Sequence, residues 1–239
     1  MTWTTTETND NGVIEREFVL PSPAGGEAGV PGLYRSPADR PAGRLVLLGH
    51  GGTNHKRGDY LNLLARLLAE RGMATLAIDG PGHGERRHFE FTGALDEFQR
   101  AWNSGGGTEG IVADWHASLD FVESEFGDRP TGWWGLSMGT MMGLPTSVAD
   151  ARIRLAVLGL MGTWGPNGDD LRRVAPDLSC PVRFLVQWDD ELVPRDRCLE
   201  LFDLLGSAKK TLHANPGRHA AVPSVEVTGS VDYLDRYLR

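Results

Sequence analysis

Several runs of the chain are hydrophobic at consecutive positions rather than at every second position. The clearest are 44–49, 73–78 and 153–160. A strand with apolar residues on both faces is typical of a parallel sheet that helices cover on both sides. Shorter extended segments near the start of the chain predict an antiparallel hairpin at one edge of this sheet. The pattern predicts about eight strands: 14–20, 30–35, 44–49, 73–78, 133–135, 153–160, 182–188 and 210–213.

Between these strands, apolar residues recur at helical spacing. Asp59 can cap one such helix, and Gly72 follows its last turn. Strand and helix therefore alternate, which predicts an α/β fold with a mostly parallel sheet and right-handed crossovers. About six helices are expected, and the best defined begin near residues 59, 111, 138, 194 and 224.

The same pattern indicates a single α/β domain over residues 1–239. Residues 1–12 are polar and rich in threonine, so we expect a frayed tail. Residues 85–107 mix charged and aromatic side chains with a run of glycines, and we expect an irregular segment over the candidate active site. The connection 161–179 is too short to hold a large cap domain.

Composition narrows the possible partners and surroundings. A net charge of −8 argues against nucleic acid and against anionic membrane surfaces. Cys180 and Cys198 are too few to cross-link the domain, so both are expected to be buried thiols. Histidines and cysteines lack the spacing of a metal site, and we expect no metal or other cofactor. Without a signal peptide or a run of about 18 apolar residues, the chain is expected to be soluble and cytoplasmic.

Polar and reactive residue types gather where five of the predicted strands end. In a parallel sheet, ligands bind beyond the carboxyl ends of the strands. Random placement would not concentrate such residues there, so the pattern favours an enzyme over a structural protein. The positions are 50–54, 79–84, Ser137, Asp189 with Asp190, and His219.

Ser137 lies between two glycines in Gly135-Leu136-Ser137-Met138-Gly139, directly after a strand and before a helix. Such a turn lifts a hydroxyl clear of the sheet, and glycine is needed where a Cβ would meet neighbouring backbone. A serine hydroxyl needs an adjacent base to act as a nucleophile. His219, on a Pro-Gly loop after the last strand, is the best placed histidine, whereas His50 and His83 fit a role in stabilising glycine-rich loops. Asp189 and Asp190 both qualify as the acid that orients His219.

The chain resembles serine hydrolases of the α/β-hydrolase superfamily, in particular the compact branch without a cap that includes esterases and dienelactone hydrolases. The resemblance implies an α/β-hydrolase fold, with Ser137 as nucleophile and His219 as general base and acid. It favours Asp190 over Asp189, because family members place the acid three residues before a Val-Pro pair. The matching segments, in the family's order, are Gly49-His50-Gly51-Gly52, Asp79-Gly80-Pro81-Gly82-His83-Gly84, Gly135-Leu136-Ser137-Met138-Gly139, Asp190-Glu191-Leu192-Val193-Pro194 and Pro216-Gly217-Arg218-His219.

An oxyanion in such a site needs two backbone donors. The N–H of Met138 directly follows the nucleophile, and the N–H of Gly52 is the expected second donor, with Thr53 as the alternative. Trp102, Trp164 and Met161 could line an apolar wall for the substrate, and ordinary packing is an equal alternative for each.

These features predict a carboxylesterase for a small or medium ester, and thioesters, lactones and amides would use the same groups. Dienelactone hydrolases typically have a cysteine nucleophile, so the serine disfavours that substrate. An acyltransferase or lyase on the same scaffold is one alternative. A ligand receptor without catalysis is another, but it would not need all three of Ser137, Asp190 and His219.

Overall fold

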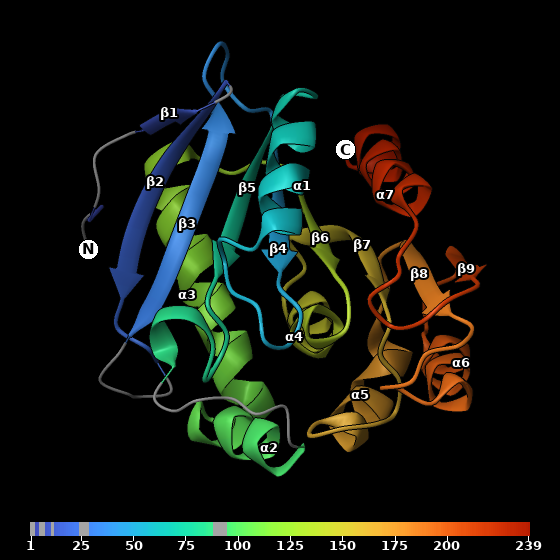
Figure 1. The fold of residues 1–239 in the computed structure, drawn as a ribbon. Coiled ribbons are helices and arrows are strands. Elements are labelled where there is room, and N and C mark those ends of the chain that lie inside the picture. The colour runs from blue at the N-terminus through green and yellow to red at the C-terminus, as the bar shows by residue number, and fades with distance from the viewer. Residues whose placement is uncertain (1–2, 5–7, 11, 24–28, 88–94) are drawn as a thin grey trace.

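The computed structural model describes residues 3–4, 8–10, 12–23, 29–87 and 95–239, and all structural statements refer to these. Its centre is one nine-stranded sheet in the order β1-β2-β3-β5-β4-β6-β7-β8-β9 (Figure 1). The strands are β1 (Thr8–Asp10), β2 (Val13–Leu20), β3 (Val30–Pro37), β4 (Arg44–Gly49), β5 (Met73–Ile78), β6 (Thr131–Gly135), β7 (Ile153–Gly159), β8 (Val182–Gln187) and β9 (Lys210–Asn215). The helices are α1 (Asp59–Ala69), α2 (Leu95–Ser104), α3 (Gly107–Phe126), α4 (Met138–Ala149), α5 (Gly168–Val174), α6 (Arg195–Leu204) and α7 (Ser224–Tyr237), with short 3₁₀ turns η1 (Gly84–Arg86) and η2 (Ala175–Asp177).

Strands β4 to β9 pair in parallel, while β2 and β3 form the antiparallel hairpin that joins the sheet at β5. The eight strands expected from the sequence are therefore present. The ninth, β1, is a three-residue edge strand that pairs with β2. This α/β fold with a mostly parallel sheet confirms the predicted fold class.

Both faces of the sheet are covered, which explains the continuous apolar runs. In β4, Leu45 and Leu47 belong to the core under α3, α4 and α6, whereas Val46 and Leu48 belong to the core under α1 and α7. Figure 1 shows α1 and α7 on one side of the sheet and α3 on the other. Successive side chains of a strand point to opposite faces, so a strand buried twice needs an apolar residue at every position.

Two expectations about irregular segments are wrong. The N-terminal tail is not frayed throughout, because β1 pairs with the sheet and the ring of Trp3 lies 4.8 Å from that of Phe121, centroid to centroid. Within the segment 85–107, residues Leu95–Ser104 form helix α2, so only part of it is irregular. The expectation for residues 88–94 lies outside the described residues.

The connection between β7 and β8 contains only α5 and η2, which agrees with the prediction that no large cap domain is inserted there. None of the helices described is both long and apolar enough to cross a membrane. Cys180 and Cys198 form no disulfide, and Cys198 is the more deeply buried of the two.

Candidate active site

Ser137 lies on the sharp turn that joins β6 to α4. Its backbone has φ 58° and ψ −120°, a left-handed conformation that few non-glycine residues adopt. The Ser137 N–H donates to the carbonyl of Gly159 at 2.9 Å, which holds the turn in place. A Cβ at Gly139 would lie 2.4 Å from the carbonyl oxygen of Gly49, and one at Gly135 would lie 2.7 Å from that of Gly139. The glycines at spacing two therefore allow the close backbone approach that the turn requires.

The structure brings Ser137, His219 and Asp190 into one hydrogen-bonded chain. Nε2 of His219 lies 2.9 Å from Oγ of Ser137, and Nδ1 lies 2.7 Å from Oδ2 of Asp190. The three residues come from the loops that follow β6, β9 and β8, which all end at the same edge of the sheet. An imidazole held in this way can accept the hydroxyl proton at Nε2 while its Nδ1–H stays bonded to the carboxylate.

Asp190, not Asp189, contacts the imidazole. The Asp190 side chain is 1% exposed, and its Oδ1 accepts the N–H of Leu192 at 2.8 Å and that of Val193 at 2.9 Å. Burial alone would raise the pKa of Asp190, but the hydrogen bonds from His219 and from the two backbone N–H groups lower it below its ordinary value. Asp190 is therefore held as a carboxylate.

Asp189 and Glu191, the neighbours of Asp190, bind the backbone of the loop that carries His219. Oδ2 of Asp189 accepts the N–H of Gly217 at 3.1 Å, and Oε2 of Glu191 accepts the N–H of His219 at 2.9 Å. The sequence analysis assigned no role to Glu191. The run of three acidic residues at 189–191 was a signal that could have indicated one. The acid loop thus fixes both the ring and the main chain of the histidine.

The loop after β4 lies against the serine turn and carries the candidate oxyanion donors. The N–H of Gly51 donates to the hydroxyl of Tyr60 at 2.6 Å, so it is already used. Met138 is the first residue of α4, and the N–H groups of a first helical turn have no acceptor within the helix. Thr53 has φ 61°, which marks a tight turn within the loop. Gly52 and Thr53 both stay predictions for the second donor.

Comparison with known proteins identifies the family. A model of the alpha/beta hydrolase family matches residues 45–236, which is most of the chain. The chain belongs to the α/β-hydrolase family.

Solved structures agree with this. The PEG-bound complex of a novel cold-adapted esterase from an Arctic intertidal metagenomic library is 55% identical, with a TM-score of 0.93 and complete coverage of both chains. An acetyl xylan esterase from Paenibacillus sp. R4 is 19% identical, with a TM-score of 0.74 over 99% of this chain and 89% of that chain. A dienelactone hydrolase from Anabaena variabilis ATCC 29413 is 18% identical, with a TM-score of 0.67 over 94% of this chain and 99% of that chain. The latter two share the fold alone. No curated protein sequence matches the chain.

Charged and ring side chains of this α/β hydrolase stabilise the two glycine-rich loops beside the serine turn. Asp79 accepts the backbone N–H and the Nζ of Lys56, at 2.8 and 2.9 Å, and both side chains are buried. Asp79 also accepts the N–H of Glu85 at 3.0 Å. The hydrogen bonds of Asp79 hold the loop after β4 against the loop after β5, which gives Asp79 a structural role.

His50 connects the same loops in a single tautomer. The N–H of Gly80 donates to Nε2 at 2.8 Å, so Nδ1 carries the proton and donates to the carbonyl of Gly51 at 2.8 Å. Burial, together with the nearby ring of His83, lowers the pKa of His50 from 6.5 to about 4. A proton on Nε2 would face the Gly80 N–H, so the geometry also requires the neutral ring.

We therefore expect acid to destabilise the fold through His50. The depressed pKa means that, between pH 6.5 and about 4, the unfolded chain binds a proton at His50 that the folded chain does not. Stability contributed by the neutral ring is complete above pH 6.5 and falls by up to about 3 kcal/mol as the pH drops toward 4. Urea unfolding at pH 7, 6, 5 and 4 will measure this. His50→Gln keeps an acceptor for the Gly80 N–H, and its free energy of unfolding should fall less steeply with decreasing pH. If the free energy of unfolding falls equally in the wild type and in His50→Gln, the acid sensitivity does not come from His50.

The expected apolar wall is corrected by the structure. Trp102 and Met161 are 2% and 4% exposed and pack within the core, so the packing alternative holds for these two. Trp164 is 41% exposed, and its contact with substrate stays a prediction.

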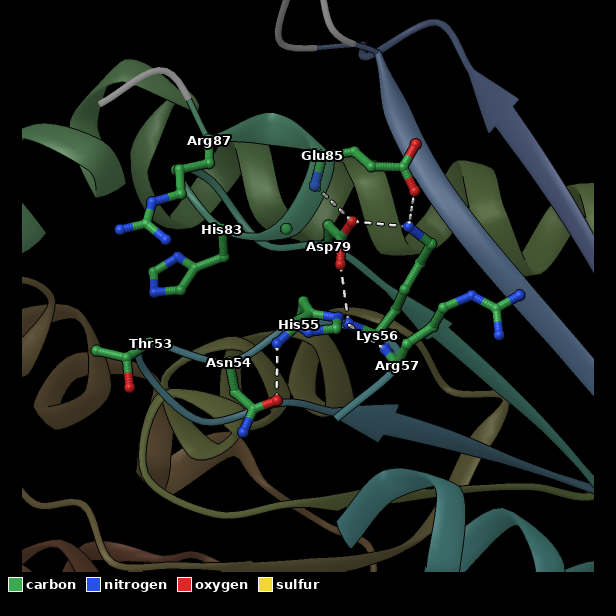
Figure 2. Close-up of a pocket in the computed structure, with 11 residues that line it drawn as sticks. Thr53, Asn54, His55, Lys56, Arg57, Asp79, His83, Glu85 and Arg87 are labelled. Atoms are coloured by element: carbon green, nitrogen blue, oxygen red, sulfur yellow. Dashed lines mark hydrogen bonds and ion pairs between the residues drawn. The ribbon is translucent and has the colours of Figure 1, made fainter. Parts of the chain in front are cut away.

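A cavity of about 430 Å³ instead opens beside the loop after β4 (Figure 2). It is lined by Thr53, Asn54, His55, Lys56, Arg57, Asp79, Gly82, His83, Gly84, Glu85 and Arg87. In the described part of the chain, no group of three or more His, Cys, Asp or Glu side chains is arranged to hold a metal ion.

Proposed function

We propose that this α/β hydrolase is a serine carboxylesterase that cleaves a small or medium carboxylic ester through an acyl-enzyme on Ser137. The observation that carries the proposal is the unbroken hydrogen-bonded chain from Ser137 Oγ through His219 to the buried carboxylate of Asp190. A chain of this kind is needed for general-base activation of a hydroxyl and has no purpose in a receptor that only binds.

The geometry supports a reaction in two halves. Oγ of Ser137 attacks the ester carbonyl carbon while Nε2 of His219 takes its proton, which gives a tetrahedral intermediate. The N–H groups of Met138 and of Gly52 or Thr53 stabilise the negative oxygen, and loss of one such donor costs about 3 kcal/mol of barrier. The intermediate collapses, the C–O bond of the alcohol breaks, and His219 gives its proton to the departing oxygen. Water then attacks the acyl-enzyme by the same steps and releases the carboxylic acid and Ser137.

The esterase with 55% identity over its whole length supports the ester bond as the target. Thioesters, lactones and amides would be cleaved by the same groups, while the serine nucleophile disfavours dienelactones. Transfer of the acyl group to an acceptor other than water is distinguished by measuring products in the presence of an added alcohol or thiol. The free thiols of Cys180 and Cys198 suit a reducing compartment, and we propose a cytoplasmic location.

A fluorophosphonate probe tests the nucleophile directly. We expect a single stoichiometric adduct on the tryptic peptide that contains Ser137, located by mass spectrometry, with parallel loss of activity toward 4-nitrophenyl acetate. Heat-unfolded protein serves as the control and should not react, because an isolated serine hydroxyl is a poor nucleophile. An adduct on another residue, or none, contradicts the proposal.

A further inference from the structure

The loop that carries His219 has no helix or strand of its own. Residues 216–223 connect β9 to α7, and Arg218 and Ala221 in this loop are exposed. The N–H of Ala221 donates to the carbonyl of Arg218 at 2.9 Å, so residues 218–221 form a β-turn with His219 at its second position. An exposed turn has little stability by itself. The position of the imidazole therefore depends on contacts between this turn and neighbouring elements.

Gln187, the last residue of β8, binds both ends of the turn. It is 1% exposed, and its Nε2 donates to the carbonyl of Arg218 at 3.1 Å and to that of Ala221 at 2.9 Å. A primary amide carries two N–H bonds on one nitrogen, so a single glutamine supplies both donors. Because β8 pairs with β7 on one side and β9 on the other, Gln187 extends from the fixed interior of the sheet.

The bond to Arg218 also fixes the peptide group directly before His219. This peptide group contains the carbonyl of Arg218 and the N–H of His219, which donates to Oε2 of Glu191 at 2.9 Å. Since a peptide group is planar, bonds at both atoms determine the orientation of the plane from which the Cα of His219 extends. Gln187 is buried whereas Glu191 is exposed, so Gln187 is the more rigid of the two anchors.

The stability of the core does not account for the Gln187 amide. Its Oε1 is buried and has no hydrogen-bond partner among the described residues. A buried polar atom without a partner destabilises a fold. A rotated amide would place Oε1 against two carbonyl oxygens, so the observed orientation is the one that the turn of His219 requires. Such a cost beside a candidate active site points to a role in function.

We propose that Gln187 is a positioning residue for His219. It holds the turn so that Nε2 lies 2.9 Å from Oγ of Ser137 and Nδ1 lies 2.7 Å from Oδ2 of Asp190. The proposal rests on the proposed esterase function and adds a residue that acts through the histidine. Both halves of the reaction use His219, so a displaced imidazole slows both. A displacement of about 1 Å costs on the order of 100-fold in rate.

Gln187→Met removes both donors and keeps the length of the side chain. We expect kcat for 4-nitrophenyl acetate to fall by roughly 30-fold while KM stays within about threefold. The fluorophosphonate probe should label the variant more slowly by a similar factor but to the same final stoichiometry, because the protein is folded and only the imidazole is displaced. Partial unfolding would instead lower the labelled fraction and leave the labelling rate of the remaining molecules unchanged.

Asn167→Leu is the matched control. Asn167 is 3% exposed, and its Nδ2 donates to the carbonyl of Met141 at 3.0 Å, so this variant also takes a buried amide away from a backbone carbonyl. That carbonyl belongs to α4 rather than to the turn of His219. At a temperature where both variants are folded, kcat of Asn167→Leu should stay within about threefold of wild type.

Hydrogen exchange in the wild type tests the same contacts without any variant. Both side-chain amide protons of Gln187 should exchange with solvent about tenfold or more slowly than those of Gln99, the other glutamine of the chain. Gln99 is half-buried on α2, and its Nε2 donates to Oδ1 of Asn103, one turn further along the same helix.

Four results would overturn the positioning role. They are a kcat of Gln187→Met within about threefold of wild type, an equal loss in Asn167→Leu, a reduced labelled fraction at the wild-type rate, and exchange of the Gln187 amide protons as fast as that of Gln99. Should Gln187→Met fail to fold, Gln187→Glu keeps the shape of the side chain without its NH2 group, and the same criteria apply. A wild type that neither cleaves 4-nitrophenyl acetate nor reacts with the probe contradicts the esterase function instead, so the two failures are distinguishable.

Discussion

Ser137→Ala should reduce kcat for 4-nitrophenyl acetate by roughly a million-fold, to the limit of detection, with little change in the melting temperature. The variant removes the only oxygen that His219 Nε2 contacts in the triad, while the backbone bond from residue 137 to the Gly159 carbonyl does not depend on the side chain. Steady-state kinetics on freshly purified protein, with the fluorophosphonate probe as an active-site titrant, will measure the loss. The probe should no longer label the variant.

Ser147→Ala is a matched control for this experiment. Ser147 is a buried serine of the same helix, α4, and it lies away from the triad, so its loss should leave kcat within about a factor of three. If Ser137→Ala instead retained a tenth or more of the wild-type rate in a preparation free of other hydrolases, a different nucleophile would have to be sought.

The sheet could be predicted from the sequence because its strands are buried on both faces. The alternation of Leu45 and Leu47 with Val46 and Leu48 between two cores leaves a continuous apolar run that is hard to mistake. Helix α2 was missed because it is short and mostly polar, and it buries little beyond Ala101 and Trp102. Its apolar residues Leu95, Phe98, Ala101 and Trp102 do recur at helical spacing, but the charged residues before them and the glycines after them favoured an irregular segment.

The contacts that hold the N-terminal segment against the sheet were also missed. Trp3 pairs with Phe18 and lies close to the rings of Tyr34 and Phe121, all far along the chain or across the sheet. A single aromatic residue in a polar, threonine-rich tail gives no local sign of such contacts. Burial of Trp102 likewise could not be told from exposure, because a tryptophan that packs and one that lines a pocket look alike in a sequence.

The residues of the candidate site also fall into two groups: those that local sequence features predicted, and those that only the folded chain brings together. The spacing of glycines around Ser137 and the position of His219 after the last strand are local features, and the two residues that they singled out lie within hydrogen-bonding distance in the structure. The contact of Glu191 with the His219 N–H joins two loops that are 28 residues apart, and only the folded chain brings them together. The choice between Gly52 and Thr53 depends on the position of a substrate oxygen, so it requires a bound transition-state analogue.

Replacement of Asp190 and replacement of Asp189 should have very different effects on kcat. Asp190→Asn should lower kcat by roughly 10³- to 10⁴-fold, because the NH2 group takes the place of Oδ2 and donates to Nδ1, which favours the wrong tautomer of His219. The amide oxygen can still accept the N–H groups of Leu192 and Val193, so the loop should remain folded. Pre-steady-state measurement of the nitrophenol burst will show whether acylation is the step that slows.

Asp189→Asn is the matched control, since it makes the same chemical change one residue away and removes the same charge. Its carboxylate accepts the exposed Gly217 N–H at 3.1 Å, a bond that an amide oxygen can keep, so kcat should stay within about fivefold of wild type. The pH dependence of activity gives a second test of the role of Asp190, because the pKa of this carboxyl is lowered. This carboxyl stays ionised as the pH falls below the ordinary range of an aspartate, so acid inactivation of the wild type above that range must come from another group. Should Asp189→Asn lose activity and Asp190→Asn retain it, the hydrogen bond at 2.7 Å to His219 would not be the one that orients the base.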